Sequence, residues 1–415
     1  MVDATFGVLG LIISIVGIVV GNASGAGAGG FVVPCFFICF GYSLAQSVAL
    51  WNAVILIVSL WRVINSIYAK ERHPEGDRPI IDFDSVLIFQ PAIFIGIEVG
   101  FITMEILPEG VKILVFSFML ATLTFFTFNK AMTRYRLEAK TEQLIVSERK
   151  SSLELVVDKA EECKEEKKKV AEVSKERPKY EGVYFPVHKF VVNMFSFVLL
   201  TTTHMILGSS KSASIIGIPT CSTSYWAVLT IYFTALVGLL IYSYSLVRSE
   251  REANKALGMK FLPSEFEWTR ELIINVGLLA VLAGFFSSSY GVGGGLILNM
   301  VLIFKGVNPE VVTATTMLSI VFICVSTTTV YWINHILPLD GYAITLIILG
   351  LPVTVLSYSV LKNILQKHSS LILFTLAGAL GVSSVLINVF GFYKVYYIDH
   401  STKVWSFGGL CPVHH

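Results

Sequence analysis

YGVGGGLILNMVLIFKGVNPEVVTATTMLSIVF, residues 290–322, decides the fold. A glycine run leads into a short apolar stretch, then a Gly-Val-Asn-Pro turn, then an apolar segment of helix length. The same opening occurs in the first half of the chain, where GGFVVP at 29–34 matches GGLILN at 294–299, with Gly41 and Gly306 closing the two copies at one constant offset. Such a repeated glycine-rich break within apolar segments points to the binding site of a membrane transporter.

The composition is that of a membrane protein. Of the 415 residues, 54% are hydrophobic and 14% are charged, whereas a soluble domain carries about 25% charged residues. The lipid bilayer is therefore the expected partner. The net charge of +2 gives no reason to expect nucleic acid. Of the six cysteines, only Cys35 and Cys39 are close in sequence, and we expect them to pack as small apolar side chains, with no disulfide framework.

Apolar runs of about 20 residues, the length that crosses a bilayer, predict an all-α polytopic protein of about ten transmembrane helices. The shorter apolar stretches 28–42 and 293–306 are expected to be re-entrant half-helices. The ten predicted spans are 5–22, 44–68, 85–106, 111–130, 186–207, 225–247, 269–289, 312–334, 340–362 and 370–392.

The spans divide into two similar four-helix halves, each with its glycine-rich break. Asp82 and Asp340 each precede a span, and Pro91 and Pro352 each lie inside the span that follows, which supports the repeat. The predicted units are a first transmembrane repeat at 1–130, a charged linker at 131–185, a two-helix insert at 186–267, a second repeat at 268–392 and a polar tail at 393–415.

The linker is rich in Lys and Arg, so the positive-inside tendency places it in the cytosol. The N-terminus falls on the same side if 28–42 is re-entrant, and on the opposite side if 28–42 crosses. Whether the two halves run parallel or inverted is therefore open at this point.

The glycine-rich breaks, Gly21–Gly30 and Tyr290–Gly295, are the first candidate site. A helix that stops and restarts there presents free backbone N–H groups and the positive end of its dipole, which together favour an anion. The alternative is close packing of helices through small residues.

Polar residues after each break form a second candidate. Asn308-Pro309 is a helix start, and Ser43 is its equivalent in the first half. The hydroxyl and amide groups that follow could complete a polar shell around a substrate, or could instead bond to their own helix backbone. They are Gln46, Ser47 and Asn52 in the first half, and Thr313, Thr315, Thr316 and Ser319, with Asn299 before them, in the second.

Glu98 lies well inside an apolar span. A carboxyl group there is costly and is a functional candidate. It could carry a proton that couples transport, pair with an unidentified cation, or line a hydrated vestibule without a coupling role. No nucleophile, metal or cofactor pattern is visible, so we predict neither an enzyme nor a bound cofactor.

These residues resemble the sulfite exporter TauE/SafE family, and the eukaryotic, plant-type members most closely. Residues 290–322 are similar to the second family signature. His73–Gly100 resembles the family's His-Pro…Pro-Ile-Ile-Asp-x-Asp…Phe-Gln-Pro block, and Ser214–Trp226 resembles its central insert. The resemblance covers nearly the whole chain apart from the linker and the tail.

The resemblance implies a carrier with its glycine motifs at the substrate site. Members of this family are associated with the movement of sulfite and small organosulfonates. The first motif departs from the family pattern: Ala26 and Ala28 interrupt its glycines, and Trp51 stands in a helix where small or polar residues are usual. Pro34 has no proline partner in the second half, because Asn299 occupies the equivalent place, and Glu98 stands where the family more often has a small neutral or hydroxyl residue. The residues that the resemblance assigns to the substrate are Gly25, Gly27, Gly29, Gly30 and Pro34, and Gly291, Gly293, Gly294 and Gly295.

The leading hypothesis is a secondary transporter of a small anion, working by alternating access. The alternative is a degenerate carrier that serves as a structural subunit, with partners in a membrane complex or as a homo-oligomer. The plasma membrane is the default location and an organelle membrane the alternative.

Overall fold

The computed structural model describes residues 4–24, 28–69, 71, 73, 79–155, 185–208, 214–256, 268, 270–292, 294–304, 307–367, 369–393 and 405. Within these residues the regular structure consists of helices, as the sequence predicts. The helices are α1 (Ala4–Ser24), α2 (Gly29–Cys39), α3 (Leu44–Tyr68), α4 (Phe83–Ile106), α5 (Glu109–Leu155), α7 (Val187–Leu207), α8 (Thr223–Ala256), α9 (Arg270–Tyr290), α10 (Gly295–Phe304), α11 (Pro309–Ile333), α12 (Gly341–Lys367) and α13 (Ser369–Tyr393).

The helix lengths match a polytopic membrane protein. In the described part of the chain, nine helices are long and apolar enough to cross a membrane. The segment expected as a tenth span forms α1, whose apolar stretch Gly7–Val19 is shorter. The two stretches expected as half-helices form α2, of 11 residues, and α10, of 10 residues.

The predicted helix starts are confirmed. Ser43 caps α3 by accepting from the Gln46 backbone N–H, while the Gln46 side chain accepts from the Ser43 backbone in return. Asn308 caps α11 and Pro309 follows in its first turn. Asp82 caps α4 in the same way, by accepting from two backbone N–H groups.

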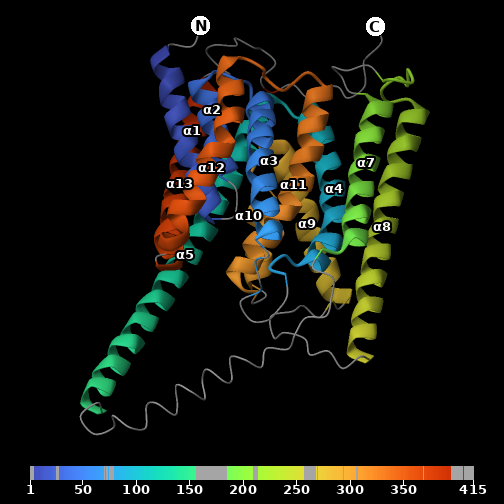
Figure 1. Cartoon of the computed structure of the whole chain (residues 1–415). Helices are drawn as coiled ribbons and strands as arrows, with labels where there is room; N and C mark the ends of the chain where they lie inside the picture. Colours follow the sequence, from blue (N-terminus) through green and yellow to red (C-terminus); the bar gives the residue numbers. More distant parts are fainter. Residues whose placement is uncertain are drawn as a thin grey trace.

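The helices of the two halves run in opposite directions. At one end of the bundle, Tyr42 before α3 contacts Asp340 before α12. At the other end, the Asp82 backbone N–H before α4 donates to Thr315 in the second turn of α11, at 2.9 Å. We call these the terminal end and the linker end, because α1 begins at the first and α5 runs on past the second (Figure 1).

The packing of the helices is reciprocal. α3 and α11 pack together at the centre, α1 packs on α12 as α9 packs on α4, and α5 packs on α13. α2 lies toward the terminal end and α10 toward the linker end (Figure 1). The arrangement is therefore inverted, and it supports the predicted repeat, which itself stays a prediction.

α1 and α2 form a hairpin that enters and leaves the bundle at the terminal end. A Cβ placed on Gly7 would overlap the Tyr342 hydroxyl at the start of α12, and one on Gly10 would lie 2.8 Å from Cys39 Cβ at the end of α2. If residues 28–42 form a re-entrant segment, the sequence predicts that the N-terminus lies on the same side as the linker. That expectation is wrong, because α1 turns back through α2 and so begins at the terminal end.

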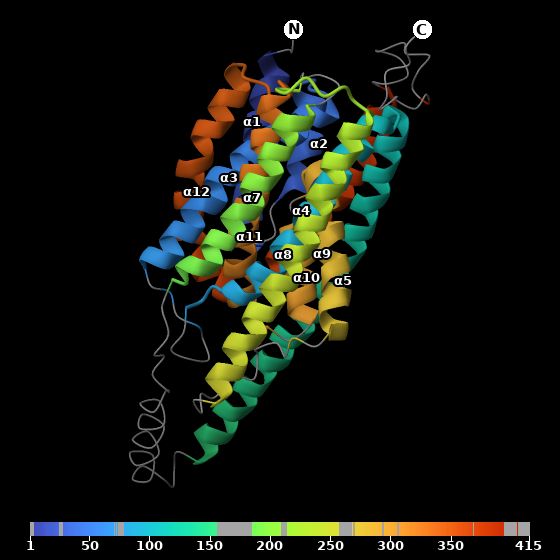
Figure 2. The ribbon, with the colours of Figure 1, turned by 90° about the vertical axis from the view of Figure 1, so that its right-hand side faces the viewer.

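α7 and α8 form a separate layer beside α4, on the face of the bundle turned toward the viewer in Figure 2. They correspond to the predicted insert. α5 continues as one helix past the predicted linker boundary at residue 130, as far as Leu155. Residues 156–184 of the linker lie outside the described residues, as does almost all of the tail.

One expectation about the cysteines is wrong. Cys221, between α7 and α8 at the terminal end, is disulfide-bonded. Cys35, Cys39 and Cys324 are free, so its partner lies outside the described residues. Sequence spacing could not identify this bond, because the two cysteines are brought together only by the fold.

Candidate functional site

The two glycine-rich breaks meet inside the bundle, at what we call the junction, where Gly29 at the start of α2 touches Gly291 just after α9. A Cβ on Gly29 would overlap the carbonyl oxygen of Gly291 and lie 2.6 Å from Nε1 of Trp51. Gly291 has φ +64°, a conformation that glycine adopts without strain. Glycine is therefore required at both positions, by close approach at one and by backbone conformation at the other.

The Trp51 indole supplies an unused donor at this junction. Trp51 is 1% exposed, and its Nε1 has no hydrogen-bond partner among the described residues. Its Cδ1 lies 3.5 Å from the position that a Cβ on Gly291 would take. A buried N–H without an acceptor costs about 1–3 kcal/mol, so an acceptor that arrives there is favoured.

Further buried polar groups on α4, α9 and α11 lack partners in the described part of the chain. The Tyr290 ring stacks on Phe116, with 5.1 Å between the ring centroids, and the Ser289 hydroxyl faces Gly100 on α4. The groups are the hydroxyls of Ser287, Ser289, Tyr290 and Ser319, and the side-chain amide of Gln90.

The other glycines predicted to bind substrate lie in different environments. A Cβ on Gly30 would meet Leu120 and Leu380 side chains, and one on Gly294 would lie 2.9 Å from Ile323 Cδ1. Gly30 and Gly294 are therefore tightly packed against apolar side chains. Pro34 and Gly295 are buried in α2 and α10, while Gly25, Gly27 and Gly293 lie outside the described residues.

The polar side chains that were predicted to form one shell around a substrate make contacts with different helices. Thr315 accepts from the Asp82 backbone and so joins α11 to the start of α4. The Thr316 hydroxyl donates to Asn299 Oδ1 at 2.7 Å and joins α11 to α10. Ser319 is 1% exposed, and its hydroxyl has no partner among the described residues.

Glu98 pairs with His204 of α7. The distance from Oε2 to Nε2 is 2.7 Å, with 3% of the Glu98 side chain and 11% of the His204 side chain exposed. His204 is the partner of Glu98 that sequence reasoning did not identify, because nothing in the sequence shows that α7 lies against α4. A histidine inside a predicted span of the insert was the signal that could have found it.

A chain of contacts joins this pair to the end of α9. The Phe101 ring lies 5.2 Å from the His204 ring and 5.3 Å from the Tyr331 ring. The Tyr331 hydroxyl donates to the Ser288 carbonyl at 2.5 Å, and the Ser288 hydroxyl donates to the Ile97 carbonyl at 3.0 Å. Ser288 is three residues before Gly291, so the pair and the junction share one packed region.

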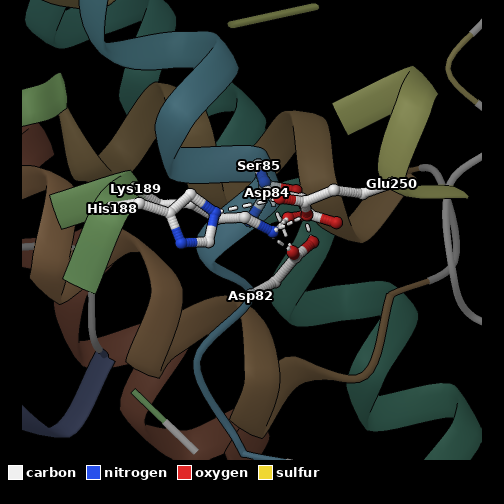
Figure 3. Close-up of polar contacts among 6 residues, drawn as sticks. All are labelled: Asp82, Asp84, Ser85, His188, Lys189 and Glu250. Carbon is white, nitrogen blue, oxygen red and sulfur yellow. Dashed lines mark hydrogen bonds and ion pairs between the residues drawn. The ribbon is translucent and has the colours of Figure 1, made fainter. Parts of the chain in front are cut away.

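A second group of charges lies at the linker end of the same helices (Figure 3). Lys189 Nζ of α7 lies 2.5 Å from Asp84 Oδ1 of α4 and 2.6 Å from Glu250 Oε2 of α8. His188 Nε2 lies 2.9 Å from the other Glu250 oxygen. Lys189 is buried, with 10% of its side chain exposed.

The two groups of charges clamp α4 to α7. Asp84 pairs with Lys189 near the starts of the two helices, and Glu98 pairs with His204 near their ends. Residue numbers rise together along both helices, so α4 and α7 run parallel. The insert is therefore attached to the first half at both ends of one helix pair.

α4 also packs closely on α9 through small residues. A Cβ on Gly96 would overlap the Val281 carbonyl, one on Gly284 would overlap the Ile93 carbonyl, and one on Gly100 would overlap the Ser288 hydroxyl. Backbones that approach this closely pass a movement of one helix directly to the other. α9 leads into the junction, so α4, to which the insert is clamped, contacts the helix that carries the second break.

Comparisons with known proteins agree with this architecture. The family model for sulfite exporter TauE/SafE matches residues 191–384. Sulfite exporter TauE/SafE family protein 2 from Arabidopsis thaliana is 24% identical over 392 residues, covering 91% of this chain and 81% of that protein. This chain is similar to the sulfite exporter TauE/SafE proteins.

Two other TauE/SafE relatives, both from Arabidopsis thaliana, cover the chain to the same extent. Family protein 1 is 24% identical over 386 residues, covering 91% of this chain and 82% of its own length. Family protein 5 is 21% identical over 378 residues, covering 91% of this chain and 81% of its own length. No solved structure matches the chain.

The TauE/SafE names describe exporters rather than enzymes. Together with the nine apolar helices of the described part of the chain, this similarity supports an integral multi-pass membrane protein. Among the described residues, no three His, Cys, Asp or Glu side chains gather as a metal site would require.

Proposed function

We propose that the protein is a secondary transporter of a small anion, with sulfite or an organosulfonate as its substrate. The observation that carries this proposal is the Trp51 indole N–H, which is buried and has no acceptor among the described residues, at the point where the breaks at Gly29 and Gly291 touch. In a water-poor interior such a donor favours a group that accepts hydrogen bonds, and an anionic oxygen is the strongest acceptor.

The rest of the junction supports an anion rather than a cation. α2 begins at Gly29 and α10 at Gly295, so two helix N-termini lie beside the breaks, each with backbone N–H groups that the helix itself leaves unbonded. The positive ends of the two dipoles add to that field. A small oxyanion would receive these N–H groups together with the Trp51 indole, without needing a Lys or Arg.

The inverted arrangement supports alternating access. α2 approaches the junction from the terminal end and α10 from the linker end (Figure 1). Carriers with inverted repeats expose one central site to each side in turn by moving one group of helices against the other. The α4–α7–α8 group, clamped by its ion pairs, is the unit that would move with α9.

The printed names of the relatives describe sulfite exporters, and we take sulfite as the first substrate to test. Sulfite, sulfate, thiosulfate and taurine would be offered to purified protein in proteoliposomes, with exchange of labelled anion as the readout. Saturable exchange of at least one of them is expected. We place the protein in the plasma membrane by default, which imaging of the tagged full chain would test.

Trp51→Phe is the decisive variant, since it keeps the ring and removes the donor. A hydrogen bond to a charged group contributes about 1.5–3 kcal/mol, which corresponds to roughly 10- to 100-fold weaker half-saturation for the anion. Trp332→Phe, at a position that is 65% exposed on α11, is the control and should leave exchange unchanged. Unaltered half-saturation in Trp51→Phe would contradict the proposed site.

A further inference from the structure

We propose that the Glu98–His204 pair is a proton-binding site that couples anion movement to the pH gradient. This inference rests on the proposed anion transport. The geometry that carries it is the contact between Glu98 Oε2 and His204 Nε2, at 2.7 Å in the membrane-spanning parts of α4 and α7. The carboxyl group that the sequence marked as functional thus has an imidazole partner on another helix.

The pair holds one proton stably. With the proton on His204, a carboxylate faces an imidazolium and the two charges cancel. Loss of the proton leaves the Glu98 carboxylate, 2% exposed, as an unpaired buried charge, which costs several kcal/mol. Gain of a second proton neutralises Glu98 and leaves the buried imidazolium without its partner in direct contact, which also costs free energy. The proton is therefore exchanged in a conformation that brings water to the pair.

The groups around the pair strengthen this preference. On α8, the nearby titratable groups are Tyr225 and Tyr232, and the Tyr232 hydroxyl donates to the Phe94 carbonyl of α4 at 3.3 Å. On α4 itself, Glu105 acts electrostatically on His204. On α9 and α11, the facing polar groups are Ser288, Ser289 and Tyr331, which carry no charge. Among the described residues, no second cation is found around the pair that could replace a protonated His204.

A route for coupling exists in the packing. Gly96 and Gly100, on either side of Glu98, touch the backbone of Val281 and the hydroxyl of Ser288 on α9. A movement of α4 that hydrates the pair therefore moves the helix that ends at Gly291. Proton binding favours the conformation in which Glu98 and His204 are in contact. By linkage, proton binding also favours the arrangement of the junction that occurs in this conformation.

The clamp at the linker end lets a structural role be separated from a coupling role. Lys189 and Asp84 join the same two helices, 2.5 Å apart, at the opposite end. Loss of that ion pair should loosen α7 without touching the proton site. Asp84→Asn is therefore a matched control for Glu98→Gln.

The experiment uses the full chain in proteoliposomes and radiolabelled sulfite as the probe. Exchange is measured at equal pH on both sides, and accumulation is measured with an imposed pH gradient. Wild type should exchange sulfite and accumulate it several-fold under the gradient. Glu98→Gln and His204→Gln should keep exchange within about twofold and lose the gradient response, while Asp84→Asn should retain it.

The double variant Glu98→Gln/His204→Gln keeps two hydrogen-bonding amides of similar size and covers the case in which a single variant does not fold. It too should exchange sulfite without responding to the gradient. A normal gradient response in the folded double variant would overturn the proposal, as would equal loss of the response in Asp84→Asn. Exchange in wild type without any gradient response would also overturn it, whereas absence of exchange would overturn the proposed function first.

Discussion

Gly29 lies against the carbonyl oxygen of Gly291, so closely that even a β-carbon on Gly29 would overlap that oxygen. The two residues are far apart in sequence and belong to the two halves of the chain. Their backbones touch where α2 begins and where α9 has just ended. The two glycine-rich breaks are therefore one structural feature of the folded protein.

We expect Gly29→Ala to destabilise the protein and to abolish anion exchange. The atom that obstructs the new methyl group is a backbone carbonyl, which cannot rotate away, so the cost is that of an overpacked core, about 1–3 kcal/mol. The measurement is thermal unfolding in detergent, followed by exchange in proteoliposomes.

Gly277→Ala is the matched control for this change. Gly277 lies in α9, and a Cβ there would meet nothing within 4 Å. Alanine has the higher helix propensity, by about 1 kcal/mol, so this variant should be as stable as wild type or more so. Equal unfolding temperatures for the two variants would contradict the close approach at Gly29.

The fold could be predicted because each span carries its own signal. Hydropathy marks the runs of about 20 residues, and the caps at Ser43 and Asn308 mark where helices begin. Both signals are local, so one sequence is enough to find them. The reverse direction of the halves is not local, and it became visible only through contacts such as Tyr42 with Asp340.

The candidate site was only partly predictable for the same reason. The glycine runs identified the breaks, but Trp51 stood out merely as a departure from the family pattern. The structure places its indole beside Gly29 and Gly291. His204 was also missed as the partner of Glu98, because a pair across α4 and α7 leaves no trace in spacing along the chain.

Gly96 and Gly284 make a second test of the helix packing. A Cβ on Gly96 would overlap the Val281 carbonyl of α9, and one on Gly284 would overlap the Ile93 carbonyl of α4. Each alanine variant should lower the free energy of unfolding by about 1–3 kcal/mol. Because the two positions lie on one interface, the double variant should cost less than the sum of the single ones.

Unfolding of the single and double variants in detergent checks this prediction, with Gly238→Ala on α8 as the control. A Cβ on Gly238 would meet nothing within 4 Å, and alanine has the higher helix propensity, so that variant should be as stable as wild type or more so. Additive losses in the double variant would show that α4 and α9 do not share one tight interface.

The contact of Tyr42 with Asp340 predicts a pH dependence at the terminal end. Burial and the hydrogen bond to the Asp340 carboxyl group raise the pKa of Tyr42. A pKa raised on folding means that the contribution to stability is complete below the ordinary tyrosine value of about 10 and is lost as pH rises through the native value. Tyr42→Phe should lose about 1–2 kcal/mol at neutral pH.

The measurement for this prediction is the unfolding temperature of wild type and Tyr42→Phe from pH 7 to pH 11. The difference between them should be constant up to about pH 10 and should shrink above it. Tyr242→Phe, at a position that is 52% exposed on α8, should follow wild type throughout. A gap that widens above pH 10 would show that the hydroxyl of Tyr42 is not held protonated.

Lys189→Met tests the clamp at the linker end. The change removes the cation shared by Asp84 and Glu250 and leaves two carboxylates facing each other. Breaking a fully buried pair costs about 3–5 kcal/mol. Here the Asp84 and Glu250 side chains are 28% and 33% exposed, so screening by water lowers the expected loss to about 2 kcal/mol.

The control is Arg248→Met on the same α8, where the ion pair with Glu252 has 58% and 63% of its side chains exposed. Exposed pairs contribute little to stability, so this variant should unfold close to wild type. Both variants are compared in detergent at low and high salt. Lys189→Met should stay destabilised at high salt, because a buried pair is screened much less than an exposed one. If its stability recovers with salt, the charges of Lys189, Asp84 and Glu250 are exposed to water and do not clamp α4 to α7.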